Sequence, residues 1–209
     1  MQRKNPGKAM CYLVVICALV SALALVGCGG GDDDDGGTVT SGQTIPSVNT
    51  GAVNVTSSNV QALVGQQLTF TNGSIFDPSL GNNPATLTFT SANPPTFSLT
   101  SGGATSSGNA TFGSCTLNFT QGPLAGPPPK SITFNPCTFQ ITASNVTVGG
   151  GAVSGTLTLT LGSSTSIAIT VQISILANGT LLINGVSTGI IISSNGTPVT
   201  TGSTGSSGQ

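Results

Sequence analysis

Residues 155–183 read GTLTLTLGSSTSIAITVQISILANGTLLI, the most regular pattern of alternation in the chain. Leucine alternates with threonine from Thr156 to Leu161, and isoleucine or valine alternates with smaller residues from Ile167 to Ile175. A period of two places the apolar side chains on one face, so both segments predict strands with one buried and one wet face. The Asn178-Gly179 pair predicts a type I′ hairpin turn, in which both central residues have positive φ.

The segment Ser166–Leu176 combines high β-propensity with no charge and no proline, which makes it hazardous as an exposed edge. We therefore expect a central strand, paired on one side with Gly155–Leu161 and on the other with Thr180–Ile183. Partner recognition would then fall to loops or to a polar edge elsewhere. The loop Gln121–Lys130 is the first candidate, because its prolines lower the entropy cost of binding.

The rest of the chain carries further short alternating runs and no convincing helical period. Candidate strands lie at 52–55, 67–70, 86–90, 96–99, 111–120, 133–142 and 189–192. The sequence predicts an all-β fold, an antiparallel sandwich or barrel of roughly eight to eleven short strands after a signal helix and a disordered tether. A single β-rich domain is expected at 44–196, followed by a disordered tail at 197–209.

Two of these runs repeat each other. Thr111–Thr120 and Thr133–Thr142 both read T-F-x-x-C-T-x-x-x-T, and their cysteines are 22 residues apart. Two copies are too few for a solenoid, which needs three or more. We interpret them as two strands joined by the loop 121–130, an antiparallel pairing that places Cys115 opposite Cys137.

Cys115 and Cys137 are the only cysteines after Cys28. In an exported protein such a pair predicts a disulfide, which would contribute about 3 kcal/mol by closing the loop. The alternatives are a redox pair or a metal site. Redox pairs prefer C-x-x-C at a helix N-terminus, and a metal site would need two further ligands, so a structural disulfide is favoured.

The N-terminus has the pattern of a membrane-targeting leader. Arg3, Lys4 and Lys8 precede an apolar run of 18 residues from Ala9 to Val26. Small residues at its end and the polar sequence that follows favour a cleaved signal peptide. An uncleaved N-terminal anchor is the alternative, because the run approaches the length of a membrane span.

Leu25-Val26-Gly27-Cys28 resembles the lipobox of bacterial lipoproteins. The resemblance implies that residues 1–27 are a signal peptide, that Cys28 receives a diacylglycerol, and that its new amine is acylated, for example with palmitate. Several acyl chains on one residue anchor a protein stably. By resemblance to the sorting rule of enteric bacteria, Gly29 in place of Asp permits transfer to the outer membrane, on its periplasmic face or the cell surface.

Residues 28–43 predict a flexible tether. Gly29–Gly37 reads GGGDDDDGG, and a Thr/Ser/Gly segment follows. Glycine gives high backbone entropy and adjacent like charges repel, which favours a disordered linker. Asp32–Asp35 could instead form a calcium loop, but such loops space their ligands along the chain, whereas these four are consecutive.

The scarcity of charge excludes several classes of function. From Cys28 onward there are five acids and one base, a formal side-chain charge of −4, and beyond Gly36 only Asp77 and Lys130 are charged. One lysine cannot neutralise the phosphates of a nucleic acid. The chain has no histidine or glutamate, so few side chains could act as general acids or bases. The same scarcity leaves too few nitrogen and carboxylate ligands for a metal site. We expect no enzyme, no metal site and no cofactor.

These observations predict a lipid-anchored cell-envelope lipoprotein with a non-enzymatic structural or protein-interaction role. The alternative is a β-module that binds a glycan or a small apolar ligand. Carbohydrate modules usually offer tryptophan or tyrosine platforms, and residues 28–209 contain neither. The expected partners are the membrane, through the N-terminal lipid, and a protein or glycan of the envelope.

Overall fold

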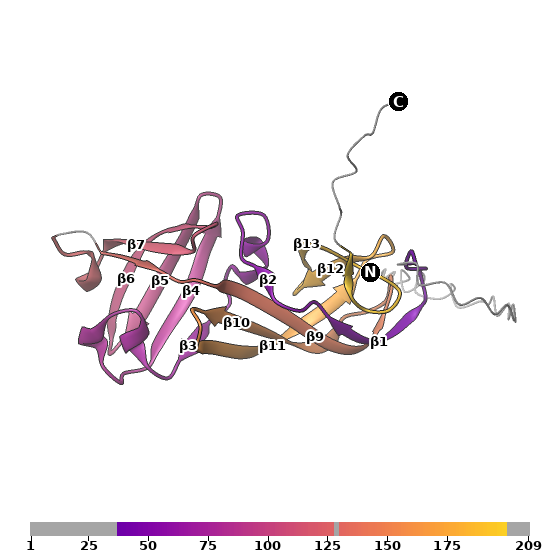
Figure 1. Ribbon diagram of the computed structural model, residues 1–209, viewed down its shortest axis with the longest axis horizontal. Coiled ribbons are helices and arrows are strands. Elements are labelled where there is room, and N and C mark those ends of the chain that lie inside the picture. The colour runs from indigo at the N-terminus through magenta and orange to yellow at the C-terminus, as the bar shows by residue number, and fades with distance from the viewer. Residues whose placement is uncertain (1–36, 128–129, 200–209) are drawn as a thin grey trace, which may run out of the picture. The chain divides into compact units, whose positions relative to one another are not determined.

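The computed structural model describes residues 37–127 and 130–199, which all belong to a compact unit that begins at Asp35. Within these residues the chain forms two curled antiparallel sheets (Figure 1). The predicted fold class, an all-β antiparallel sandwich or barrel, is confirmed. The expected signal peptide 1–27, Cys28 and the tether up to residue 36 lie outside the described residues.

One sheet has eight strands in the order β1-β9-β10-β11-β12-β13-β14, with β2 paired to β9. Its early strands pair with its later ones, because β1 and β2 both lie against β9. The strands are β1 (Thr44–Asn49), β2 (Val53–Asn54), β9 (Cys137–Thr147), β10 (Val153–Leu161), β11 (Thr165–Ile175), β12 (Thr180–Ile183), β13 (Val186–Ile192) and β14 (Pro198–Val199).

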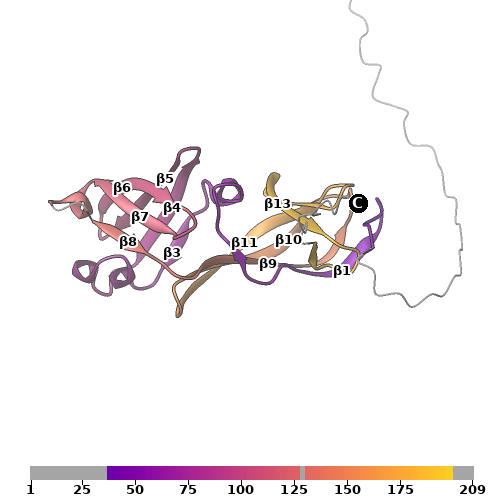
Figure 2. The same cartoon turned by 45° about the horizontal axis from the view of Figure 1, so that its top comes forward.

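The other sheet has six strands in sequence order, and Figure 2 shows them side by side. Short turns join β4 to β7 in sequence, as in a meander, while longer connections that contain 3₁₀ turns join β3 to β4 and β7 to β8. The strands are β3 (Leu68–Phe70), β4 (Ala85–Ala92), β5 (Pro95–Ser101), β6 (Ala104–Thr111), β7 (Thr116–Gln121) and β8 (Ser131–Thr133).

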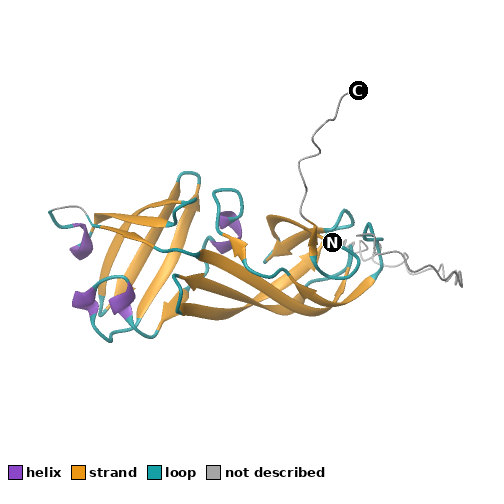
Figure 3. Ribbon diagram, in the orientation of Figure 1, coloured by secondary structure: helices purple, strands orange, loops and turns teal. Residues whose placement is uncertain are grey.

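Fourteen strands in the described residues exceed the eight to eleven expected, because β2, β3, β8 and β14 have only two or three residues. The helical segments of the described residues are four short 3₁₀ turns in the connections (Figure 3). These turns are η1 (Val60–Leu63), η2 (Gly73–Ile75), η3 (Pro78–Leu80) and η4 (Pro123–Ala125).

A single cluster of buried side chains serves both sheets. The inward residues of β4, β5 and β7 and those of β9, β10 and β11 belong to this cluster, so the alternation in sequence does identify the buried faces. Phenylalanines are its largest side chains, and Phe70 contacts Phe76 edge to face with ring centroids 5.2 Å apart. Such aromatic pairs add about 0.5–1.5 kcal/mol beyond the area they bury.

The two strands expected beside the Ser166–Leu176 segment are its neighbours in the structure, but they do not pair with it along its whole length. β10 pairs with β11 from Leu161↔Thr165 to Val153↔Ile173. β12 pairs only with the last three residues, Ile173 to Ile175. The strand is therefore central at its C-terminal end and an edge in its N-terminal half, because β12 is only four residues long and turns away after Ile183.

The predicted type I′ turn at Asn178-Gly179 is wrong. Only Gly179 has positive φ there, at 83°. Leu176 donates to the carbonyl of Thr180, which closes a three-residue loop of the kind that ends in one left-handed residue. The next turn has the expected geometry instead, since Asn184 and Gly185 have φ of 49° and 80°.

The folded unit extends beyond the predicted boundaries 44–196 at both ends. Within the segment assigned to the tether, Val39 is buried in the core, and the Gly42 N–H donates to the Val148 carbonyl at 2.8 Å. Within the segment assigned to the tail, β14 pairs with β13 through Ile191↔Val199 and Ile192↔Pro198. One apolar residue in a polar segment was too weak a signal to predict either contact.

Candidate functional site at the disulfide

Cys115 and Cys137 form a disulfide, as predicted, with Cα atoms 5.9 Å apart. Cys115 ends the turn between β6 and β7 and has a φ of 46°, in the left-handed region that a turn can impose. Cys137 is the first residue of β9. Both cysteines are buried, so the bond forms part of the core while it links one sheet to the other.

The predicted antiparallel pairing across the loop 121–130 is present, but the register that placed Cys115 opposite Cys137 is wrong. β7 pairs with the short strand β8 through Thr116↔Thr133, and the Phe134 N–H donates to the Cys115 carbonyl at 3.0 Å. Cys115 therefore lies opposite Phe134. The chain then leaves the six-stranded sheet, and Cys137 starts a strand of the other sheet. The two T-F-x-x-C-T repeats are not equivalent strands, because the first spans a turn and the second spans the crossover.

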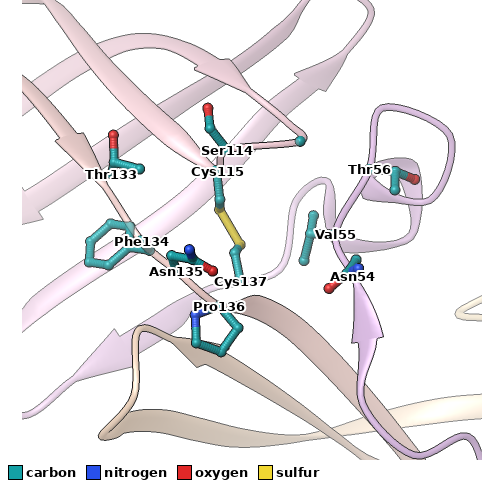
Figure 4. A pocket seen from close by; sticks show the side chains of 11 residues that line it. Asn54, Val55, Thr56, Ser114, Cys115, Thr133, Phe134, Asn135, Pro136 and Cys137 are labelled. Carbon is teal, nitrogen blue, oxygen red and sulfur yellow. A yellow bond between two sulfur atoms is a disulfide. The ribbon is translucent and has the colours of Figure 1, made fainter.

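A cavity of about 430 Å³ lies beside the disulfide (Figure 4). Three chain segments line it: the end of β2 with the two residues that follow, the turn before β7, and the crossover from β8 to β9. They contribute Asn54, Val55, Thr56, Gly113, Ser114, Cys115, Thr133, Phe134, Asn135, Pro136 and Cys137.

Backbone hydrogen bonds hold the first of these segments against the disulfide. The Val55 N–H donates to the Cys137 carbonyl at 3.0 Å. Asn59 fixes the turn that follows, because its side-chain nitrogen donates to the Asn54 carbonyl and its side-chain oxygen accepts from the Thr56 N–H, each at 2.8 Å. A buried amide that is satisfied on both sides makes this wall of the cavity rigid.

The cavity offers neutral hydrogen-bonding groups over an apolar floor. Ser114 and Thr133 hydroxyls both bond to the Thr116 hydroxyl, at 3.0 and 2.8 Å. Asn54 and Asn135 are exposed and present amides. No residue of the lining is charged, so the cavity can orient an uncharged polar ligand and has no group to transfer a proton.

Asp77 and Lys130 form an ion pair in a different part of the molecule. The Asp77 carboxylate is buried and also caps η3, where it accepts from the Ser79 N–H at 2.7 Å. Lys130 is about one-third exposed and ends the loop 121–130 that we predicted as a recognition element. This loop is also held at Leu124, whose N–H donates to the Ser106 hydroxyl at 3.1 Å. The one acid and the one base of the domain therefore stabilise a loop.

The sequence predicted the two cysteines of this site and missed the other lining residues. Gly113, Ser114 and residues 133–136 adjoin the cysteines in sequence, so their proximity could have been inferred. Asn54–Thr56 could not, because only the pairing of β2 with β9 brings them there. Cys28 lies outside the described residues.

Comparison with protein-family models, with curated proteins and with solved structures found no match for this chain. In the described part of the chain, no three His, Cys, Asp or Glu side chains gather where they could hold a metal ion. Over the same residues, no helix has the length and apolar character needed to cross a membrane. The fold and the site define an all-β protein of two disulfide-linked sheets.

Proposed function

We propose that this chain is a lipid-anchored protein of the cell envelope, at the outer membrane, with a non-enzymatic structural or protein-interaction role. The anchor is the acylated Cys28, and the two-sheet unit is the part presented to partners. Support for the anchor comes from the sequence, in which a basic start, an apolar run and Leu25-Val26-Gly27-Cys28 follow in order.

The observation that carries the non-enzymatic role is the Asp77–Lys130 ion pair. Beyond Gly36 these residues are the whole supply of charged groups. A catalytic carboxylate must reach the proton that it transfers. The Asp77 carboxylate is buried, pairs with Lys130 and accepts a hydrogen bond from the first turn of η3. Its interactions therefore stabilise the fold.

Membrane fractionation tests the anchor. Cys28→Ser removes the acyl-accepting thiol, so the variant should lose lipid labelling and move to the soluble fraction. Cys11→Ser and Cys17→Ser are matched controls, since both cysteines lie inside the leader and should leave labelling and membrane attachment unchanged. A Cys28→Ser variant that stays fully with the membranes would show that an uncleaved helix holds the protein.

A second candidate function is glycan binding in the cavity beside the disulfide. Its volume of about 430 Å³ lies in the range of ligand sites, and its side chains are neutral hydrogen-bonding groups. This lining favours a neutral sugar over an apolar ligand.

Calorimetry with neutral oligosaccharides tests the second candidate. Asn135→Ala should weaken any binding at least about tenfold if its amide bonds the ligand and the loss is near 1.4 kcal/mol. Asn109→Ala is the matched control, because Asn109 is exposed on β6 away from the cavity. Equal affinities of the two variants would place the ligand elsewhere.

A further inference from the structure

The N-terminal half of β11 has a free edge. β10 pairs with one side of β11 from Thr165 to Ile173, but on the other side β12 reaches only Ile173–Ile175. Figure 1 shows β11 beside β10 and β9, with β3 of the other sheet close to its start. Thr165–Gln172 is therefore an uncharged strand segment with a second strand on one side only.

The hydrogen bonds of Gln172 show which backbone groups face this edge. The Gln172 N–H donates to the Asn184 side chain, and the Gln172 carbonyl accepts from the Asn184 N–H, both at 2.8 Å. Gln172 therefore points its backbone groups away from β10. In an antiparallel ladder this direction alternates, so Ser166, Ala168 and Thr170 point the same way.

All three of these residues are exposed, and no group among the described residues bonds to their N–H or C=O on that side. They present three donors and three acceptors in the spacing of a strand. Natural sheets usually protect such an edge with charged residues, prolines or bulges, and this segment has none of them.

A groove of about 430 Å³ opens along the same edge. Ser164–Ala168 form one wall, and Thr69–Asn72 with Ile75 form the other. Phe70, Ile75 and Ile167 supply apolar surface, while threonine, serine and asparagine form the rim. A strand added to β11 would place every second side chain toward this groove.

The groove selects for an uncharged occupant. None of its lining residues is charged, and the two charged residues of the domain already neutralise each other. A charged side chain buried here would lose its hydration without a counter-charge, which is costly. A second copy of β11 fits less well than a separate strand, because its own Ile167 and Ile169 already pack against its own core and cannot fill the groove.

We propose that the open edge of β11, from Ser166 to Thr170, binds an uncharged extended segment of a partner protein by strand addition. The partner's backbone bonds to Ser166, Ala168 and Thr170, and one of its apolar side chains enters the groove beside Phe70. This inference rests on the protein-interaction role proposed above and names its surface. It places recognition on a strand edge, whereas the sequence alone favoured the loop 121–130.

Amide exchange with a peptide probe tests the inference on the protein purified as the cell processes it. The probe is a capped peptide of about seven residues that alternates threonine and valine, long enough to span the edge. Binding should slow exchange of the Ser166, Ala168 and Thr170 N–H groups at least about tenfold. The Ile167 and Ile169 N–H groups should not change, because they already bond to β10.

Two variants and a modified probe provide the controls. Ala168→Pro removes one outward N–H and no bond to β10, so the fold should persist while peptide affinity falls at least about tenfold. Ala168→Val keeps the N–H and should bind as the native protein does. If Ala168→Pro does not fold, two probes replace it, one N-methylated at the odd-numbered and the other at the even-numbered peptide positions. Only one of the two sets of N–H groups faces β11, so one probe should lose binding and the other should keep it.

Three results would overturn the inference. The peptide could protect N–H groups of other residues, or the two methylated probes could bind with equal affinity. Raised protein concentration alone could protect the Ser166, Ala168 and Thr170 N–H groups, which would identify a second copy as the occupant. None of them would affect the anchor, since lipid labelling of Cys28 is measured separately.

Discussion

The Cys115–Cys137 bond joins the residue before β7 to the first residue of β9, two positions that belong to different sheets. Its loop of 22 residues contains β7, η4 and β8. Without the bond, the hydrogen bonds between β7 and β6 would still hold this segment to the six-stranded sheet. The bond therefore limits how far the unfolded chain can spread and fixes one wall of the cavity.

Replacing both cysteines by alanine should lower the free energy of unfolding by about 3 kcal/mol, the loop-closure value for a loop of this size. Urea denaturation of the variant measures the loss. The reduced native protein is the control and should lose a similar amount. A loss below about 0.5 kcal/mol would mean that the bond contributes little to stability.

The Asp77–Lys130 pair predicts an asymmetric pair of substitutions. Lys130→Met leaves the buried Asp77 carboxylate without its counter-charge, and we expect a loss of about 2 kcal/mol, reduced from the fully buried case because Lys130 is partly exposed. Asp77→Asn keeps the cap on η3 and removes the charge, so adding Lys130→Met to it should cost less than about 0.5 kcal/mol. Equal losses in the two backgrounds would show that the ion pair is not coupled.

At the scale of elements, β6 shows how a strand forms without large apolar residues. Its inward positions are Ser106, Gly108 and Ala110. Gly108 pairs with Phe97 on one side and Phe119 on the other, and those two rings meet edge to face with centroids 5.1 Å apart. Glycine therefore leaves room for two neighbouring aromatic side chains to pack across it.

Gly108→Ala should destabilise the protein by more than about 2 kcal/mol, the range of strained core substitutions. A Cβ at this position would collide with the carbonyl oxygen of Asn118 in β7, which is backbone and cannot rotate away. Gly151→Ala is the matched control, because nothing lies within 4 Å of its Cβ position. Thermal unfolding of both variants decides the matter, and similar midpoints would contradict the close approach of β6 and β7.

The size of the inward side chains explains which strands the sequence could predict. β10 and β11 were predictable because large apolar residues alternate with polar ones along each strand. β6 was not, because its inward side is made of small residues that no hydrophobic period detects. The edge on β11 was also hidden, since the length of β12 depends on where its turn falls and not on the composition of β11.

At the scale of the whole described unit, the six-stranded sheet is an insertion into the eight-stranded one. The chain leaves after β2, builds β3–β8, and returns at β9. β2 and β9 pair at the point of exit and return, through Val53↔Phe139 and Asn54↔Thr138. The disulfide and the cavity lie at the same place, so one set of contacts closes the insertion and shapes the candidate site.

The residue types at this place were enough to predict the disulfide, but the strand connections around it could not be predicted from them. The even cysteine pair after the leader-like segment predicted a disulfide, and the bond is present. The register around it and the crossover to the other sheet were not predicted, because local alternation is the same for a strand that stays in its sheet and for one that crosses to another. Asn54–Thr56 joined the site only through that crossover.

The lipid anchor on Cys28 would determine where the two-sheet unit and its free edge meet partners. Mass spectrometry of the N-terminal peptide of the protein isolated from membranes tests it most directly. The account predicts a chain that begins at Cys28, with a diacylglycerol on the thiol and an acyl group on the amine. An N-terminal peptide that begins at Met1, or an unmodified Cys28, would contradict it.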